Sequence, residues 1–158
     1  MSNEKYKYYY LYLYLSEYLK SLNVYDDLIY KIETLSNILN SRYSSTGKKI
    51  IINGLGIRLN NMGNEVRISK LSSGERNDFI MFFDLVFRTE NHSLILIDEP
   101  EISLHVSWQE TYMDDVLEAL KGKECQLIIF THSPDLVSYH NDAVINLGSD
   151  CLKINNPR

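Results

Sequence analysis

The stretch LILIDEPEISLH, residues 94–105, decides the fold of this 158-residue chain. Its first four residues are all apolar, and a short apolar run that ends in acidic residues is typical of a buried parallel strand. Open α/β sheets bind ligands at the carboxyl ends of their strands, so Asp98 and Glu99 stand at a predicted binding edge. Taken alone, the pattern fits equally a strand that ends in a solvated acidic turn, and the neighbouring sequence favours the binding edge.

Upstream, residues 71–75 read LSSGE and begin a predicted helix from Ser73 to Arg88. Serine and glycine at a helix start expose backbone N–H groups at the positive end of the dipole, which suits an anion. Taken alone, the segment is also an ordinary helix cap. The helix carries Phe79, Phe82 and Val86 on one apolar side.

Downstream, residues 130–134 read FTHSP and close a second apolar run at 127–130. Because parallel strands end at the same edge, this order places His132 beside the acidic pair. A helix is predicted between the strands at 106–120, a short helix near Ser133 and a last strand at 143–147. A lone histidine at a strand end is often structural, so the argument depends on all three motifs occurring together.

The first 70 residues form a different kind of structure. Residues 5–22 alternate leucine with tyrosine like a strand, yet apolar residues also recur at steps of three and four, and the long run without turn residues favours a helix. A second helical stripe covers 25–43. Short apolar runs at 49–52, 55–59 and 65–68, joined by asparagine–glycine turns, predict a β-meander.

Together these motifs resemble the ABC ATPase superfamily, most closely its overcoming-lysogenization-defect (OLD), RecF and SMC-like branch, which includes the AAA-type ATPases of anti-phage defence systems. Residues 71–75 resemble the signature motif, 94–99 Walker B, 101–105 the D-loop, and His132 the switch histidine of the H-loop. The resemblance implies an α/β fold, a partial P-loop NTPase of ABC type. Its mainly parallel sheet with flanking helices would be preceded by an N-terminal helical segment and a small β-meander.

The resemblance also implies roles for individual residues. Asp98 would hold Mg²⁺ through water, Glu99 would be the general base, and His132 would contact the γ-phosphate of ATP. The signature residues would bind ATP held on a facing subunit, with Ser73 and Gly74 capping its γ-phosphate. That motif comprises Leu71, Ser72, Ser73, Gly74 and Glu75. The D-loop contributes Glu101, Ser103 and His105, the last two at the dimer interface.

One family element is missing from these 158 residues. The phosphate-binding loop, Gly-x-x-x-x-Gly-Lys-[Ser/Thr], has no match, because Arg42 and Leu117 stand where the two Gly-Lys pairs would need a glycine. We therefore expect residues 1–158 to be the C-terminal half of an ABC-type ATPase domain. Its helical segment would be 1–45, its meander 46–70 and its α/β core 71–158.

Such a half would hydrolyse ATP only with a protein partner that bears the Walker A loop, or it would form a homo-oligomer. The alternative is a non-catalytic docking or regulatory module, or a truncated remnant of such an ATPase. The net charge of -5 does not indicate nucleic-acid binding, although a local basic patch remains possible. The apolar stretch at 8–15 is too short to span a bilayer, so we expect no membrane association and a cytoplasmic protein.

Overall fold

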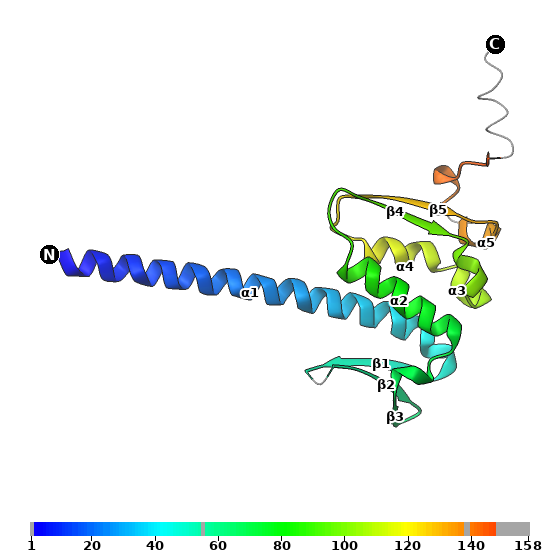
Figure 1. Ribbon diagram of the computed structural model, residues 1–158, viewed down its shortest axis with the longest axis horizontal. Helices are drawn as coiled ribbons and strands as arrows, with labels where there is room; N and C mark the ends of the chain where they lie inside the picture. The colour runs from blue at the N-terminus through cyan, green and yellow to red at the C-terminus, as the bar shows by residue number, and fades with distance from the viewer. Residues whose placement is uncertain (1, 55, 138–139, 148–158) are drawn as a thin grey trace, which may run out of the picture. The chain divides into compact units, whose positions relative to one another are not determined.

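The computed structural model describes residues 2–54, 56–137 and 140–147 (Figure 1). They form two compact units. The first comprises Met1–Lys70 with Val86–Arg88, and the second comprises Leu71–Leu85 with Thr89–Arg158. Within the described ranges, every helix is too short or too polar to cross a bilayer.

The first unit begins with one long helix, α1, from Ser2 to Tyr43. The sequence predicted two helices here, and the structure joins them because no glycine or proline interrupts residues 2–43. The strand alternative for residues 5–22 is excluded. Toward the C-terminal end, Leu35, Leu39 and Tyr43 are fully buried.

The N-terminal part of α1 is different, because its large side chains are exposed around the whole helix. Tyr8, Tyr12 and Tyr14 are each about two-thirds exposed, at 70%, 69% and 67%. Leucines 11, 15 and 19 on the same stretch are also about half exposed, between 47% and 59%. Apolar surface of this extent usually marks a contact region.

The first unit also contains the predicted meander, an antiparallel sheet of order β1-β2-β3. The strands are β1 (Lys48–Asn53), β2 (Gly56–Asn61) and β3 (Asn64–Val66). Ile50 pairs with Leu59, and both are buried. Asn40 on α1 fixes the helix to β1, because its amide both accepts from the Ile50 N–H (2.6 Å) and donates to the Ile50 carbonyl (3.2 Å).

Two details of the predicted meander differ. Ile68, predicted at the end of a strand, begins the 3-10 turn η2 (Ile68–Lys70), and Leu55 lies outside the described residues. Another 3-10 turn, η1 (Ser44–Thr46), leads from α1 into the sheet and ends at Gly47. Gly47 has φ 69°, a left-handed conformation that glycine adopts without strain.

The second unit contains helices beside a parallel strand pair. Its elements are α2 (Ser73–Phe87, whose last two residues belong to the first unit), β4 (Ser93–Asp98), η3 (Pro100–Ser103), α3 (Val106–Gln109), α4 (Tyr112–Ala119), β5 (Cys125–Phe130), α5 (Pro134–Val137) and η4 (Asn141–Ala143). Phe82 and Tyr112 join α2 to α4, with ring centroids 6.4 Å apart. The predicted helix at 106–120 is broken after Gln109. The predicted strand at 143–147 is wrong, since Ala143 closes η4 and residues 144–146 take no regular form.

β4 and β5 pair in parallel, with Leu96 opposite Ile128 and Asp98 opposite Phe130. One face of this pair is open: Leu94, Leu96, Ile128 and Phe130 are 44–60% exposed. Within the described residues the core sheet is a parallel pair and the meander before it is a separate antiparallel sheet of three strands, an α/β arrangement compatible with the expected partial P-loop NTPase fold.

Candidate functional site

The chain leaves β4 through a strained residue. Asp98 is the last residue of the strand and is exposed. Glu99, which follows it, has φ 44° and ψ 53°, a left-handed conformation that costs a non-glycine residue roughly 1 kcal/mol or more. Its N–H nevertheless donates to the Phe130 carbonyl at 2.8 Å, which ties the turn to the end of β5. Strain of this kind concentrates at functional sites.

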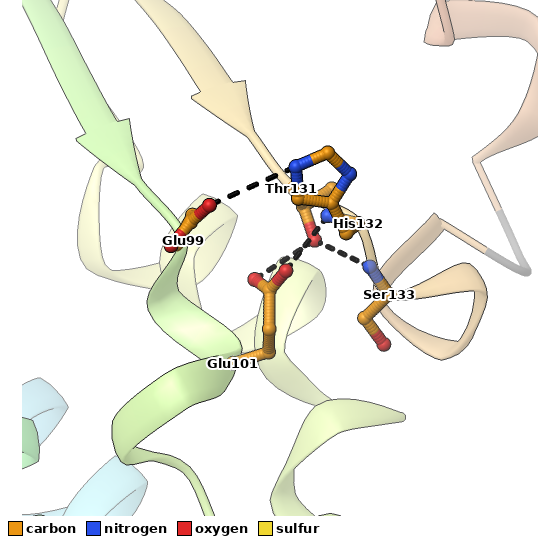
Figure 2. A network of polar contacts seen from close by, with 5 residues as sticks. All are labelled: Glu99, Glu101, Thr131, His132 and Ser133. Carbon is orange, nitrogen blue, oxygen red and sulfur yellow. Dashed lines mark hydrogen bonds and ion pairs between the residues drawn. The ribbon is translucent and has the colours of Figure 1, made fainter.

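This turn brings Glu99 next to His132. Glu99 Oε1 lies 3.7 Å from His132 Nε2 (Figure 2), too far for a hydrogen bond but close enough for an ion pair when the imidazole is protonated. The side chains are 43% and 90% exposed, respectively. An exposed pair of this kind adds little stability, and both side chains are accessible to a ligand from solvent.

Glu101 occupies the centre of the cluster in Figure 2, where it accepts two hydrogen bonds from the loop after β5. Oε1 accepts from the backbone N–H of His132 at 2.7 Å, and Oε2 accepts from the Thr131 hydroxyl at 2.9 Å. The Thr131 hydroxyl in turn accepts from the Ser133 N–H at 3.0 Å. One carboxylate therefore organises three consecutive residues.

The same bonds set the charge of Glu101. Burial acts to raise its pKa, but hydrogen bonds from the His132 N–H, its own N–H, the Thr131 hydroxyl and the Ser133 N–H together outweigh burial. The net result is a pKa below the ordinary 4.5, because these donors stabilise the ionised form. Glu101 is therefore a carboxylate at neutral pH.

Gln109 extends the network to the end of α3. Its side-chain oxygen accepts from the Ser133 hydroxyl at 2.7 Å. The loop from Thr131 to Ser133 is thus held by two hydrogen-bond acceptors, Glu101 in η3 and Gln109 in α3. The sequence pattern assigned no role to Thr131, Ser133 or Gln109; for the first two, the available signal was the run of polar residues directly after a buried strand.

The start of α2 is a capping box. Ser72 Oγ accepts from the Glu75 N–H at 3.3 Å, and Glu75 Oε2 accepts from the Ser72 N–H at 2.7 Å. Glu75 is buried, so its carboxylate belongs to the cap. The N–H groups of Ser73 and Gly74 occupy the first two helical positions, which have no acceptor within a helix, and Ser73 is exposed. Leu71, just before the cap, is buried.

The remaining predicted site residues lie between Glu101 and α3. Ser103 is the last residue of η3. His105 is the N-cap of α3, where its Nδ1 accepts from the Ser107 N–H at 3.3 Å, and its ring lies 5.9 Å from that of Trp108. The structure brings Glu99, Glu101 and His132 together, whereas the polar contacts of His105 are with its own helix.

The site could hold a hard divalent cation only if water and phosphate supplied most of the ligands of the ion. Among the residues described, no group of three or more histidine, cysteine and acidic side chains could hold a metal ion. Magnesium, however, often takes one or two protein carboxylates and completes its shell with water and phosphate. The exposed Asp98 carboxylate at the strand end suits that mode.

Comparison with known proteins finds two kinds of relative. The AAA ATPase domain family matches residues 3–137. Proteins described as "Probable iron chelatin transport ATP-binding protein" from two strains of Helicobacter pylori are each 31% identical over 80 residues. That stretch covers 51% of this chain and 30% of each relative, so the matched part is under a third of the length of these relatives.

Proposed function

The chain belongs to the AAA ATPase domain family, and on that premise we propose that residues 1–158 are the C-terminal, hydrolysis-side half of an ABC-type ATPase domain. Both comparisons support an ATPase role. The finer assignment rests on one observation: Glu99 and His132 meet at the carboxyl edge of β4 and β5, with Asp98 beside them. The branch we propose is the OLD, RecF and SMC-like one, with a task in defence or on DNA.

In the proposed reaction, Glu99 accepts a proton from the water that attacks the γ-phosphate, and His132 hydrogen-bonds to that phosphate. The 3.7 Å gap between the two side chains, both solvent-accessible, allows a water or a phosphate oxygen to contact both. Asp98 is the residue that would hold Mg²⁺, which would supply positive charge against the phosphates. Positioning and charge supply most of the catalysis in phosphoryl transfer.

The start of α2 is proposed to serve a facing subunit. The capping box uses Ser72 and Glu75 internally, which leaves the N–H groups of Ser73 and Gly74 for an anion. In the arrangement that the ABC ATPase resemblance implies, the anion at residues 71–75 is the γ-phosphate of ATP bound to another subunit. Ser103 and His105 would lie at the same interface.

The phosphate-binding loop must come from outside these 158 residues, because no Gly-Lys pair here has the required spacing. The open sheet face of Leu94, Leu96, Ile128 and Phe130 supports this. Parallel sheets are ordinarily covered on both faces by helices, so a further helix is expected over this face. Among the described residues β4 and β5 pair only with each other, which leaves their outer edges for further strands. A strand added there would present its following loop at the same edge as Asp98.

The test is to supply that loop. We define the completed ATPase as this chain together with the segment, on the same or a neighbouring polypeptide, that carries Gly-x-x-x-x-Gly-Lys-[Ser/Thr]. Mg-dependent ATP hydrolysis should appear in the completed ATPase and in neither part alone. If the two parts associate tightly and hydrolysis stays absent, the non-catalytic docking or regulatory role is correct instead.

A further inference from the structure

We propose that Glu101 is a positioning residue for His132: it fixes the loop after β5 and thereby the place of the imidazole relative to Glu99. The importance of that placement rests on the proposed function. The family resemblance puts Glu101 in the D-loop, a segment that the resemblance associates with the interface between subunits. In this structure, however, Glu101 contacts Thr131 and His132, which belong to the same compact unit.

The first step is that the His132 ring depends on its backbone for its position. The side chain is 90% exposed, so packing does little to hold it. Its backbone N–H donates to Glu101 Oε1 at 2.7 Å, a charge-assisted hydrogen bond because the lowered pKa keeps Glu101 ionised. The residue before it is held by Oε2 of the same carboxylate.

The second step is that Glu99 and Glu101 are parts of one short turn. Glu99 is the N-cap of η3, and Glu101 is its second residue. The buried Pro100 between them restricts the backbone. Because the Glu99 N–H also donates to the Phe130 carbonyl, the turn is attached on both sides of Pro100, to the last residue of β5 before it and to the loop after β5 beyond it. The turn that carries Glu99 therefore also sets the position of His132.

The experiment is NMR on the 158-residue chain without nucleotide, with Glu101→Ala and the matched control Glu118→Ala on the exposed surface of α4. Glu101→Ala removes the charge-assisted hydrogen bond from the His132 N–H. The rate of amide hydrogen exchange at His132 should therefore rise about tenfold, while the amides in α4 and β4 keep their exchange rates. In the wild-type background, Glu99→Gln should shift the His132 ring resonances, and that shift should be lost in Glu101→Ala. Glu118→Ala should change neither result.

A second pair of variants covers the case in which Glu101→Ala does not fold. Thr131→Val removes the hydroxyl that links Glu101 to the Ser133 N–H, whereas Thr131→Ser keeps it. We expect faster exchange at the His132 amide in Thr131→Val, because the Glu101 carboxylate then loses one of its two contacts with the loop, and wild-type exchange in Thr131→Ser. Unchanged His132 exchange and an unchanged Glu99→Gln shift in a folded Glu101→Ala overturn the proposal, as does wild-type exchange in Thr131→Val.

Kinetics separate this inference from the proposed function. In the completed ATPase, Glu101→Ala should lower kcat at least about tenfold with little change in KM for ATP, since it displaces a group that acts on the γ-phosphate. NMR effects as expected but no hydrolysis by the wild-type completed ATPase would refute the proposed function and leave the positioning role standing. Wild-type kcat in Glu101→Ala would refute the positioning role alone.

Discussion

Glu99 Oε1 and His132 Nε2 lie 3.7 Å apart, just beyond the ends of the parallel strands β4 and β5, where Asp98 pairs with Phe130, 32 residues later in the chain. This relationship makes the role of Glu99 testable. Glu99→Gln keeps the shape of the side chain and removes the base, so the completed ATPase should lose at least about a hundredfold in turnover while still holding ATP. Single-turnover hydrolysis and nucleotide retention on a filter are the measurements.

Glu118→Gln is the matched control for that variant, because it makes the same chemical change on the exposed surface of α4 and should keep wild-type turnover. Equal hydrolysis by wild type and Glu99→Gln would remove Glu99 from the role of base. In that case the ion pair with His132 would be a surface contact of small energetic value.

The second prediction concerns the 158-residue chain by itself. Backbone N–H groups and the lysine of a phosphate-binding loop supply much of the affinity for nucleotide phosphates, and this stretch has no such loop. We expect calorimetry with Mg-ATP to show no saturable binding in the micromolar range and phosphate release to stay at background. Saturable micromolar binding would show that these residues build a complete phosphate site in some other way.

Sequence patterns predicted the meander, α2, β4 and β5, because each of these elements has a local signal: an asparagine–glycine turn, a helix cap or an apolar run. They also predicted that Glu99 and His132 would come together, since both follow parallel strands. They could not predict the hydrogen bonds of Glu101 to Thr131 and His132, which depend on the exact path of two turns 30 residues apart. The strand at 143–147 failed because a short apolar run that pairs with no strand among the described residues has no fixed preference.

The third prediction follows from the charge of Glu101. Its pKa is below 4.5 in the folded chain and ordinary in the unfolded chain, so its ionised form contributes its full stability only at pH values well above 4.5. That contribution to stability is lost as the pH falls through the lowered pKa of Glu101 in the folded chain. The difference in unfolding free energy between wild type and Glu101→Gln should therefore be constant above about pH 6 and shrink in the acid range. Urea titrations at a series of pH values measure it.

A flat difference down to acid pH would contradict that prediction. The side chains of Glu99 and His132 face the same cluster and are present in both proteins, so their contributions cancel in the comparison unless Glu101 changes them. Repeating the urea titrations in the Glu99→Gln background tests that cancellation. The difference in unfolding free energy between Glu101 and its Gln variant should depend on pH in the same way there.

The fourth prediction concerns the start of α2. Gly74→Glu places a carboxylate beside the N–H groups proposed to face the γ-phosphate, and its charge should repel that phosphate and block ATP-driven closure of the completed ATPase. The fold should survive, because a negative charge in the first turn suits the helix dipole. Asn77→Glu adds the same charge further along α2 and should close normally. Closure in both variants would exclude the proposed contact.

The last prediction concerns assembly. A homodimer of this chain would contain two LSSGE segments and no phosphate-binding loop, so Mg-ATP has no complete site through which to hold it together. The exposed tyrosines and leucines of α1, among them Tyr8, Tyr12 and Leu15, nevertheless offer a large apolar surface. We therefore expect either an oligomer that forms without nucleotide and buries this part of α1, or a stable complex with the segment bearing the loop. Light scattering over a concentration series, with and without Mg-ATP, measures which of these assemblies forms.

Replacing Tyr8, Tyr12 and Leu15 by glutamine should abolish the nucleotide-independent oligomer, since it removes apolar area while keeping good helix formers. A monomer at every concentration that also fails to bind the loop-bearing segment, or dimerisation of the lone chain driven by ATP, would contradict the expectation.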